Sequence, residues 1–463
     1  METLDTVVLI AYLAGVTGIA LWAGRKQVSA QSYFLGNRNL PWGMVMLSLV
    51  ATETSVLTFL SVPGVAYISD LGFLQLALGY IVGRWLVARF LLPDYFDQGL
   101  ESTYEFIRNR WGPGTQKFTS LVFLVTRVLA DGVRLFITAI PVSLITGWSY
   151  PASIAVIGGV TLIYTLVGGI RSVVWADSLQ FVLYLGGALV GFAVLNSGVE
   201  GGWQTILETA GREGKLQFLH FGPGSILGEK YHFLTAVAGG MFLSIASHGT
   251  DHLMVQRLLA SRNVRSGQKA LVGSGFMVFL QFALFLVLGA GLWVYYGGAD
   301  IQSDRVFSTF IVESLPPGVS GLLLAGIFSA AMSTLSSSIN SLASSSMTDW
   351  IKDVWPRRHT LTVSRALSVF WALVLAGGAS LFASQDNPLV EVGLTIASFT
   401  YGGLLGFFVL GRLKRDFPPQ IVIGGFLASL ITMVGVISLT EIAWPWFTFV
   451  GLSAMLLVSF AAA

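Results

Sequence analysis

Long apolar runs recur along this chain of 463 residues and restrict its possible folds more than any other feature. Runs of about 18 or more apolar residues are long enough to cross roughly 30 Å of hydrocarbon as helices. Hydrophobic residues make up 54% of the chain and charged residues only 11%, a composition that soluble proteins of this size do not have. The sequence therefore predicts an all-α polytopic membrane protein.

The apolar runs predict about thirteen spans. They are expected at residues 4–22, 42–67, 71–92, 118–147, 151–168, 173–196, 232–260, 268–297, 317–348, 361–384, 389–411, 419–438 and 443–461. With the N-terminus outside, most Lys and Arg residues of the connecting segments fall on the cytoplasmic side, as the positive-inside rule requires. We therefore expect a multi-pass protein of the cell inner (plasma) membrane with its N-terminus outside.

The chain shows no linker or long charged tail, so residues 1–463 are expected to form a single transmembrane domain. Acidic residues precede the first apolar run, and Arg25 and Lys26 follow it. This is the reverse of a cleaved signal peptide, which begins with a basic region. The first run is therefore expected to remain as a leading helix.

Several kinds of chemistry are disfavoured by the residues present. The chain has no cysteine and only five histidines, which are scattered, so thiol chemistry and zinc-type sites are not expected. No phosphate-binding loop of the GxxxxGK[ST] type occurs, which argues against ATP-driven transport. Basic residues are dispersed among the loops, which argues against nucleic-acid binding. An enzyme is therefore not expected, and no obligatory protein partner is evident.

Two spans have unusually polar middles, "SLVATETS" (48–55) and "SIASHGTD" (244–251). Ser48 aligns with Ser244 and Thr54 with Thr250, and the two spans lie five apart, so they cross the membrane in opposite senses. Transporters built from inverted repeats place their sites where such helices are interrupted. Two repeats of five spans are therefore predicted, the first over 42–196 and the second over 232–411, followed by trailing helices at 419–461.

Ionisable residues within apolar spans are costly, so each is a candidate for function or for a structural ion pair. Glu53 could serve a cation or pair with a buried arginine, and Asp177 could bind an ion or act locally. Arg127, Asp131 and Arg134 share one face of a predicted helix. Pairing of Arg127 with Asp131 would leave Arg134 for a carboxylate-bearing solute; pairing of Arg134 with Glu53 or Asp131 is the alternative.

The stretch "AMSTLSSSINSLASSSMTD" (331–349) continues an apolar run and carries many hydroxyls. Small residues in membrane helices commonly serve close packing. At helical spacing, however, these hydroxyls form a one-sided stripe that could supply neutral oxygens to a monovalent cation such as Na⁺. Both interpretations remain open for any single serine of the stretch.

Three motifs resemble the sodium:solute symporter family. They are "GGIRSVVWADSLQ" (168–180), in which Ala176 replaces the usual Thr, "GTDHLMVQRLLASRNVRSGQKA" (249–270), in which His252 stands where Gln is common, and "AMSTLSSSINSLASSSMTDWIKD" (331–353). The resemblance runs from about Tyr33 to Arg415. It implies a LeuT-like fold with a 5+5 inverted repeat and Na⁺ as the co-transported ion.

The resemblance also implies site residues. The principal sodium site would use Ala51, Thr54, Ala330, Ser333 and Thr334. A second sodium site, present in some members, would use Asp177, Ser336 and Ser337, and Glu53 would be linked to a cation. The solute would lie among Ser55, Thr58, Gln75, Arg134, His248, Thr400 and Tyr401.

The sequence thus predicts Na⁺-coupled symport of a small polar solute into the cell by alternating access. Arg134 favours a carboxylate-bearing solute, such as an organic acid, an amino acid or an acidic sugar; a neutral sugar is the alternative. A proton-coupled symporter with Glu53 as proton carrier and a non-transporting solute sensor are the competing functions. The expected partners are the solute, the sodium ion and the lipid bilayer.

Overall fold

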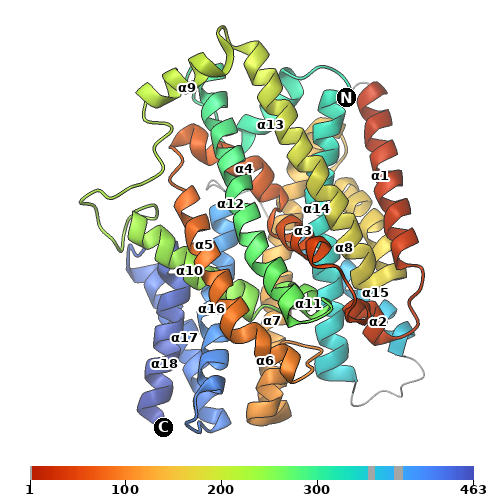
Figure 1. Ribbon diagram of the computed structural model, residues 1–463, viewed down its shortest axis with the longest axis vertical. Helices are drawn as coiled ribbons and strands as arrows, with labels where there is room; N and C mark the ends of the chain where they lie inside the picture. Colours follow the sequence, from red (N-terminus) through yellow and green to blue (C-terminus); the bar gives the residue numbers. More distant parts are fainter. Residues whose placement is uncertain (1–2, 353–359, 380–388) are drawn as a thin grey trace.

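The computed structural model describes residues 3–352, 360–379 and 389–463, and most of them lie in helices (Figure 1). Nine of the described helices are long and apolar enough to cross a membrane, or up to eleven spans if each of two bent pairs counts as one. The N- and C-terminal ends lie at opposite ends of the molecule (Figure 1). The all-α membrane fold is therefore confirmed.

The helices of the first half follow the predicted spans closely. They are α1 (Thr3–Gly24), α2 (Ala30–Leu35), α3 (Trp42–Glu53), α4 (Val56–Ile68), α5 (Leu74–Leu86), α6 (Leu92–Asp97), α7 (Glu105–Thr146) and α8 (Tyr150–Gly198). A π-helical turn, Val87–Leu91, joins α5 to α6. The short α2 was not predicted, because its single apolar turn lies inside a polar connecting segment.

The second half has a similar order. Its helices are α10 (Phe233–Gly249), α11 (His252–Leu259), α12 (Val264–Tyr295), α14 (Val319–Ser345), α15 (Thr360–Ala379), α16 (Leu389–Arg412), α17 (Pro419–Leu439) and α18 (Phe447–Ala462). The outer helices α9 (Gly202–Arg212) and α13 (Ser303–Glu313) were not predicted, because they are too short to span. The last residues of the expected span 361–384 lie outside the described part of the chain.

Helix α8 contains two of the predicted spans, and Gly169 divides them. Its φ of +52° and ψ of −142° are not helical, and only glycine adopts them readily. A Cβ at this position would lie 2.1 Å from the carbonyl oxygen of Tyr33, on α2. The break therefore falls where the sequence places a short connection, and α2 packs directly against it.

Two helix pairs are bent at short interruptions, as the polar middles predict. The axes of α3 and α4 differ by 59°, and those of α10 and α11 by 60°. The first interruption lies at Thr54 and Ser55, the second at Thr250 and Asp251. At the first, the N–H of Ser55 donates to the carbonyl of Glu53. The carbonyl of Ala51 thereby loses the donor that a continuous helix would give it.

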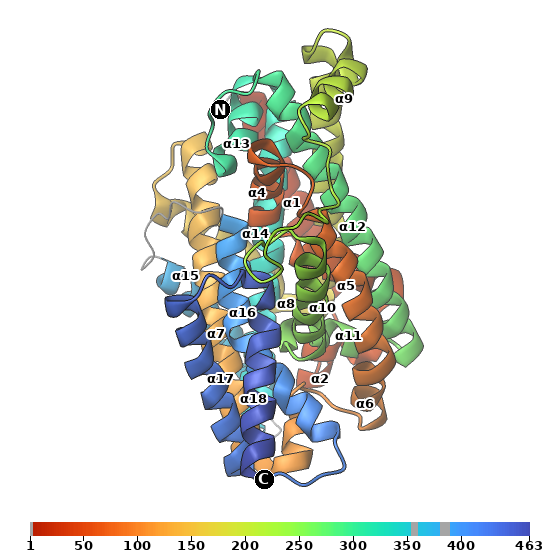
Figure 2. The same ribbon diagram turned by 90° about the vertical axis from the view of Figure 1, so that its left-hand side faces the viewer.

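Helix α14, which carries the hydroxyl stripe, occupies the centre of the molecule. It packs against α8, α1, α7 and α3, and nearly all of its side chains are buried. Helices α17 and α18 pack together and against α16 at the periphery (Figure 2). The polar face of α14 is thus turned towards protein and not towards lipid.

Candidate functional site

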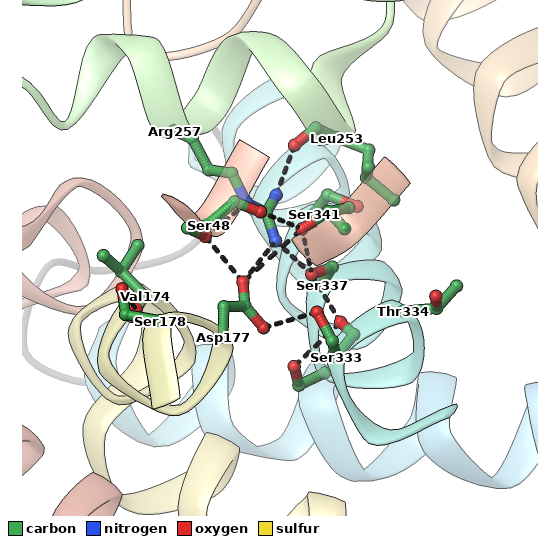
Figure 3. Close-up of polar contacts among 12 residues, drawn as sticks. Ser48, Val174, Asp177, Ser178, Leu253, Arg257, Ser333, Thr334, Ser337 and Ser341 are labelled. Carbon is green, nitrogen blue, oxygen red and sulfur yellow. Dashed lines mark hydrogen bonds and ion pairs between the residues drawn. The ribbon is translucent and has the colours of Figure 1, made fainter. Parts of the chain in front are cut away.

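A buried carboxylate at Asp177 organises the polar residues around α14 (Figure 3). It lies in the second half of α8 and is fully buried. Its Oδ1 accepts a hydrogen bond from Ser333 Oγ at 2.7 Å, and its Oδ2 accepts one from Ser48 Oγ at 2.5 Å. One carboxylate therefore links α8 to α14 and to the first interrupted helix, α3.

Arg257 of α11 balances this carboxylate (Figure 3). It is fully buried, its Nη2 lies 3.5 Å from Asp177 Oδ2, and its Nε donates to Ser48 Oγ at 2.9 Å. It also donates to Ser337 Oγ and, at 2.6 Å, to the carbonyl of Leu253. A buried ion pair is tolerated only when its polar atoms are satisfied in this way. Arg257 brings the second interrupted helix into the same cluster.

The cluster is rich in neutral oxygens. Thr52 Oγ1 lies 3.1 Å from Ser337 Oγ and 3.4 Å from Asp177 Oδ2. No group of three or more His, Cys, Asp or Glu suited to a metal ion occurs among the described residues. Hydroxyls with a single carboxylate suit a monovalent cation better than a divalent one, because the local charge stays small.

The predicted residues of the principal sodium site are only partly gathered. Ala330 and Thr334 line a small cavity with Ser55 at the first interruption. The side chain of Thr54 does not line this cavity, because its hydroxyl is hydrogen-bonded to the amide of Gln281 on α12. Ser333 points to Asp177. The two predicted sodium sites are therefore adjacent and share α14.

Ser336 and Ser337 behave differently, although both were predicted for a second sodium. Both hydroxyls donate to the carbonyl of Ser333, at 2.6 Å from Ser337 and 3.1 Å from Ser336. Only Ser337 also accepts a hydrogen bond from Arg257 of the Asp177 cluster. Ser48, Thr52 and Arg257 belong to the cluster and were not among the predicted site residues. Arg257 could have been found as a charged residue in the apolar segment "HLMVQRLLA" (252–260), since Asp177 needs a counterion.

A second group of charges borders a cavity of about 560 Å³, open solvent included, between the two interrupted helices. Arg127 of α7 lies with its Nη2 2.5 Å from Asp251 Oδ2 and 2.9 Å from Tyr401 Oη, and Tyr401 donates to the same Asp251 oxygen at 2.6 Å. All three side chains are nearly inaccessible to solvent. They tie α7, α16 and the second interruption together.

The expected pairing of Arg127 with Asp131 is present at 3.4 Å, but Asp251 is much closer. Asp131 also pairs with Arg134 at 3.2 Å and accepts a hydrogen bond from Ser338. Arg134 is therefore paired with Asp131, which was the alternative left open by the sequence, and is not an unpaired cation. Its side chain is nevertheless 20% exposed, against 3% for Arg127, and Arg134 lines both cavities.

Glu53 lies at the other side of the same cavity and forms an ion pair with Arg84 of α5. Arg84 is fully buried and also donates to Ser274 Oγ at 2.7 Å. His248 Nε2 lies 3.9 Å from the Glu53 carboxylate, and Ser247 Oγ lies 2.8 Å from His248 Nδ1. Pairing with a buried arginine is the structural alternative that the sequence allowed for Glu53.

The remaining predicted solute residues are dispersed. His248 and Tyr401 line the larger cavity and Ser55 the smaller one. Three others do not line these two cavities. Thr58 Oγ1 is directed to the carbonyl of Glu53, Thr400 Oγ1 has no described hydrogen-bond partner, and Gln75 is bonded to Tyr231, Gly72 and His220 at the outer loop.

Comparison with known proteins matches residues 33–411 to the sodium:solute symporter family. The human sodium/iodide cotransporter is 31% identical over 433 residues, which cover 89% of this chain and 66% of that protein. The sodium/sialic acid symporter NanT of Aliivibrio fischeri is 26% identical over 474 residues, covering 100% and 93%. The chain thus spans about two thirds of the human relative and nearly all of the bacterial one.

Solved structures confirm the fold. A substrate-bound, outward-open Na⁺-coupled sialic acid symporter matches with a TM-score of 0.91 at 24% identity, covering 100% of this chain and 98% of that one. Mhp1, a nucleobase-cation-symport-1 family transporter, matches with a TM-score of 0.55 at 14% identity, covering 92% and 93%. The fold is LeuT-like, as predicted. The relatives are transporters and not enzymes, and sodium is their coupling ion. The chain therefore belongs to the sodium:solute symporter family.

Proposed function

We propose that this protein couples the entry of Na⁺ to the uptake of a small organic anion by alternating access across the plasma membrane, with its N-terminus outside. The observation that carries the proposal is the Asp177 cluster. It joins α3, through Ser48, and α11, through Arg257, to the hydroxyls of α14. A cation bound beside this cluster would act on both interrupted helices at once, which is what coupling between two sites requires.

The principal sodium would be held by backbone carbonyls at Ala51 and Thr54 and by oxygens of Ala330, Ser333 and Thr334. The carbonyl of Ala51 lacks its regular helical donor, because Ser55 N–H is engaged by Glu53. A freed carbonyl next to buried hydroxyls is a favourable ligand for a monovalent cation in a membrane protein.

A second sodium would use Asp177, Ser336 and Ser337. Ser337 is already in contact with the Asp177 cluster, and Ser336 is one residue away on the same helix. Binding there requires Arg257 to yield part of its contact with Asp177, since both cations need the same carboxylate. One tightly bound sodium and one weaker one are therefore expected.

The solute would lie in the cavity bordered by Arg134, His248 and Tyr401, and Ser55 lines the smaller cavity that shares Arg134 with it. Arg134 is the more exposed of the two arginines there, and its Nε has no described acceptor. It therefore retains donors for a carboxylate, which guanidinium binds well. Relatives named for iodide, monocarboxylates and sialic acid all carry anions.

Binding of ²²Na⁺ to the purified protein tests the sodium proposal without knowledge of the solute. Ser333→Ala should weaken Na⁺ binding about tenfold, because a hydroxyl that serves both Asp177 and the cation is lost. Ser341→Ala is the matched control, since its hydroxyl donates only to the carbonyl of Ser338 on the same helix. Equal Na⁺ affinities in Ser333→Ala and wild type would exclude the assignment.

The solute class is tested by uptake into proteoliposomes with an inward Na⁺ gradient. Labelled monocarboxylates, iodide, sialic acid and a neutral sugar should be compared in wild type and Arg134→Gln. We expect Na⁺-dependent uptake of one of the organic anions, reduced at least tenfold in Arg134→Gln. Uptake of the neutral sugar alone, or an undiminished rate in the variant, would overturn the anion assignment.

A further inference from the structure

We propose that a groove between the end of α1 and the second half of α8 binds the phosphate head group of an anionic phospholipid. The groove has a volume of about 590 Å³, open solvent included, and is lined by Trp22, Ala23, Arg25, Lys26, Arg171 and Trp175. It lies at the end of α1 that the charge distribution predicts to be cytoplasmic. None of these residues has a part in the sodium or solute sites described above.

Three cations converge on this groove from two separate segments. Arg25 and Lys26 follow α1, and Arg171 lies two residues after the break at Gly169. None of them forms an ion pair with a carboxylate among the described residues, and Arg171 Nε is buried without a hydrogen-bond partner. Unpaired guanidinium groups that share a concave surface are suited to a phosphate, which accepts several charge-assisted hydrogen bonds.

Two tryptophans form the apolar wall of the groove. The rings of Trp22 and Trp175 meet edge to face with their centroids 6.1 Å apart, and the guanidinium of Arg25 lies 5.7 Å from the Trp22 ring centroid. Trp22 is 57% exposed. Tryptophan beside arginine and lysine is typical of the membrane interface, where the ring meets the glycerol region and the cation meets the phosphate. This pairing favours a lipid over a free phosphate ion.

The two segments that carry the cations are held rigidly against each other. A Cβ added to Gly24 would lie 2.3 Å from the Cα of Gly168, so the two backbones are in direct contact. Ser172 Oγ donates to the carbonyl of Ala20 at 2.5 Å. The separation of Lys26 from Arg171 is therefore set by backbone packing. The groove is consequently a built site and not a chance meeting of flexible side chains.

Native mass spectrometry of the full-length protein in detergent tests this proposal. Wild type should retain one phosphatidylglycerol at concentrations at which phosphatidylcholine is lost. The triple variant Arg25→Gln, Lys26→Gln, Arg171→Gln should bind phosphatidylglycerol more weakly by on the order of a hundredfold, since each interfacial cation contributes to attraction of anionic lipid. The matched control is Arg265→Gln, Lys269→Gln, Lys414→Gln, which removes the same charge from exposed positions elsewhere.

Further variants separate a lipid site from its alternatives. Lys26→Gln alone changes an exposed side chain and should weaken phosphatidylglycerol binding several-fold even if the triple variant does not fold. Trp22→Leu should weaken lipid binding while leaving any binding of inorganic phosphate unchanged. Displacement of the lipid by low-millimolar inorganic phosphate would assign the groove to free phosphate and overturn the proposal. Equal losses in the two triple variants, or equal retention of both lipids by wild type, would also overturn it.

Discussion

The two interrupted helices occupy matching places in the two halves of the chain, and their breaks begin in the same way. At the first break, Thr54 donates its hydroxyl to the carbonyl of Val50 at 2.8 Å. At the second, Thr250 donates its hydroxyl to the carbonyl of Ala246, also at 2.8 Å. In each case a threonine hydroxyl donates to the carbonyl four residues back, a hydrogen bond that slightly destabilises helices and often bends them.

The surroundings of the two breaks then diverge. The first is met by a neutral amide, Gln281, whereas the second carries Asp251, which is held by Arg127 and Tyr401. The charge of Glu53, one residue before the first break, is balanced by Arg84 of α5, and Thr54 and Ser55 at the break itself are neutral. A break that is bound by an ion pair to α7 and α16 can move relative to them only if that pair is broken. We therefore expect the first break to serve cation binding and the second to control movement.

Asp251→Asn should have the largest effect, because it removes the closest partner of a fully buried arginine. Loss of one member of a buried ion pair costs about 3–5 kcal/mol of folding free energy. The apparent unfolding temperature of the purified protein should fall by several degrees or more, and uptake should be abolished. Tyr401→Phe, which removes one hydroxyl and no charge, should cost only about 1 kcal/mol. Equal effects of the two variants would contradict a charge-controlled second break.

Ser48→Ala and Ser244→Ala form the next pair, since the two serines occupy equivalent positions in the repeats. Ser48 Oγ serves both Asp177 and Arg257, whereas Ser244 Oγ donates to the carbonyl of Tyr80 at 3.2 Å. We expect Ser48→Ala to cost about 1.5–3 kcal/mol and to weaken ²²Na⁺ binding, and Ser244→Ala to cost about 1 kcal/mol with unchanged Na⁺ binding. A shift in Na⁺ affinity that is the same in both variants would remove the distinction between the two breaks.

Thr54→Val and Thr250→Val should show the smallest difference in stability. Each variant loses an equivalent hydrogen bond from the threonine hydroxyl to the carbonyl four residues back. Thr54 also loses its contact with Gln281, and the amide is left buried with fewer partners. Thr54→Val should therefore be less stable than Thr250→Val by about 1 kcal/mol, measured as unfolding temperature in the same detergent. The reverse order would show that the second break depends more on its threonine than on its ion pair.

The sequence predicts the helices of this protein well because an apolar run in lipid has few alternatives to a helix. It also predicts both interruptions, since the polar stretches around Thr54 and Thr250 stand out against apolar neighbours. Helix α9 was not predicted, because its apolar face is too short to indicate a membrane span. The resemblance of three motifs to one family supplies the fold, which the apolar pattern alone does not.

The identity of charged partners on distant helices is the part that the sequence does not predict. Arg127 and Asp131 are one helical turn apart, so a local ion pair is the natural expectation. The closer partner, Asp251, is far away in sequence and lies at the second interruption. Asp177 and Arg257 are likewise far apart in the sequence and lie on separate helices. Partners on separate helices depend on how the helices pack, and one sequence contains no direct measure of that distance.

The contact of Gly169 with the carbonyl of Tyr33 has a further consequence. Asp177 lies eight residues after Gly169 in the same helical half of α8. A small change in the backbone angles of Gly169 would therefore displace the Asp177 carboxylate. The close contact with Tyr33 of the short helix α2 restricts that change. The geometry of the buried ion pair between Asp177 and Arg257 is thus set partly by a short helix that lies outside the spans.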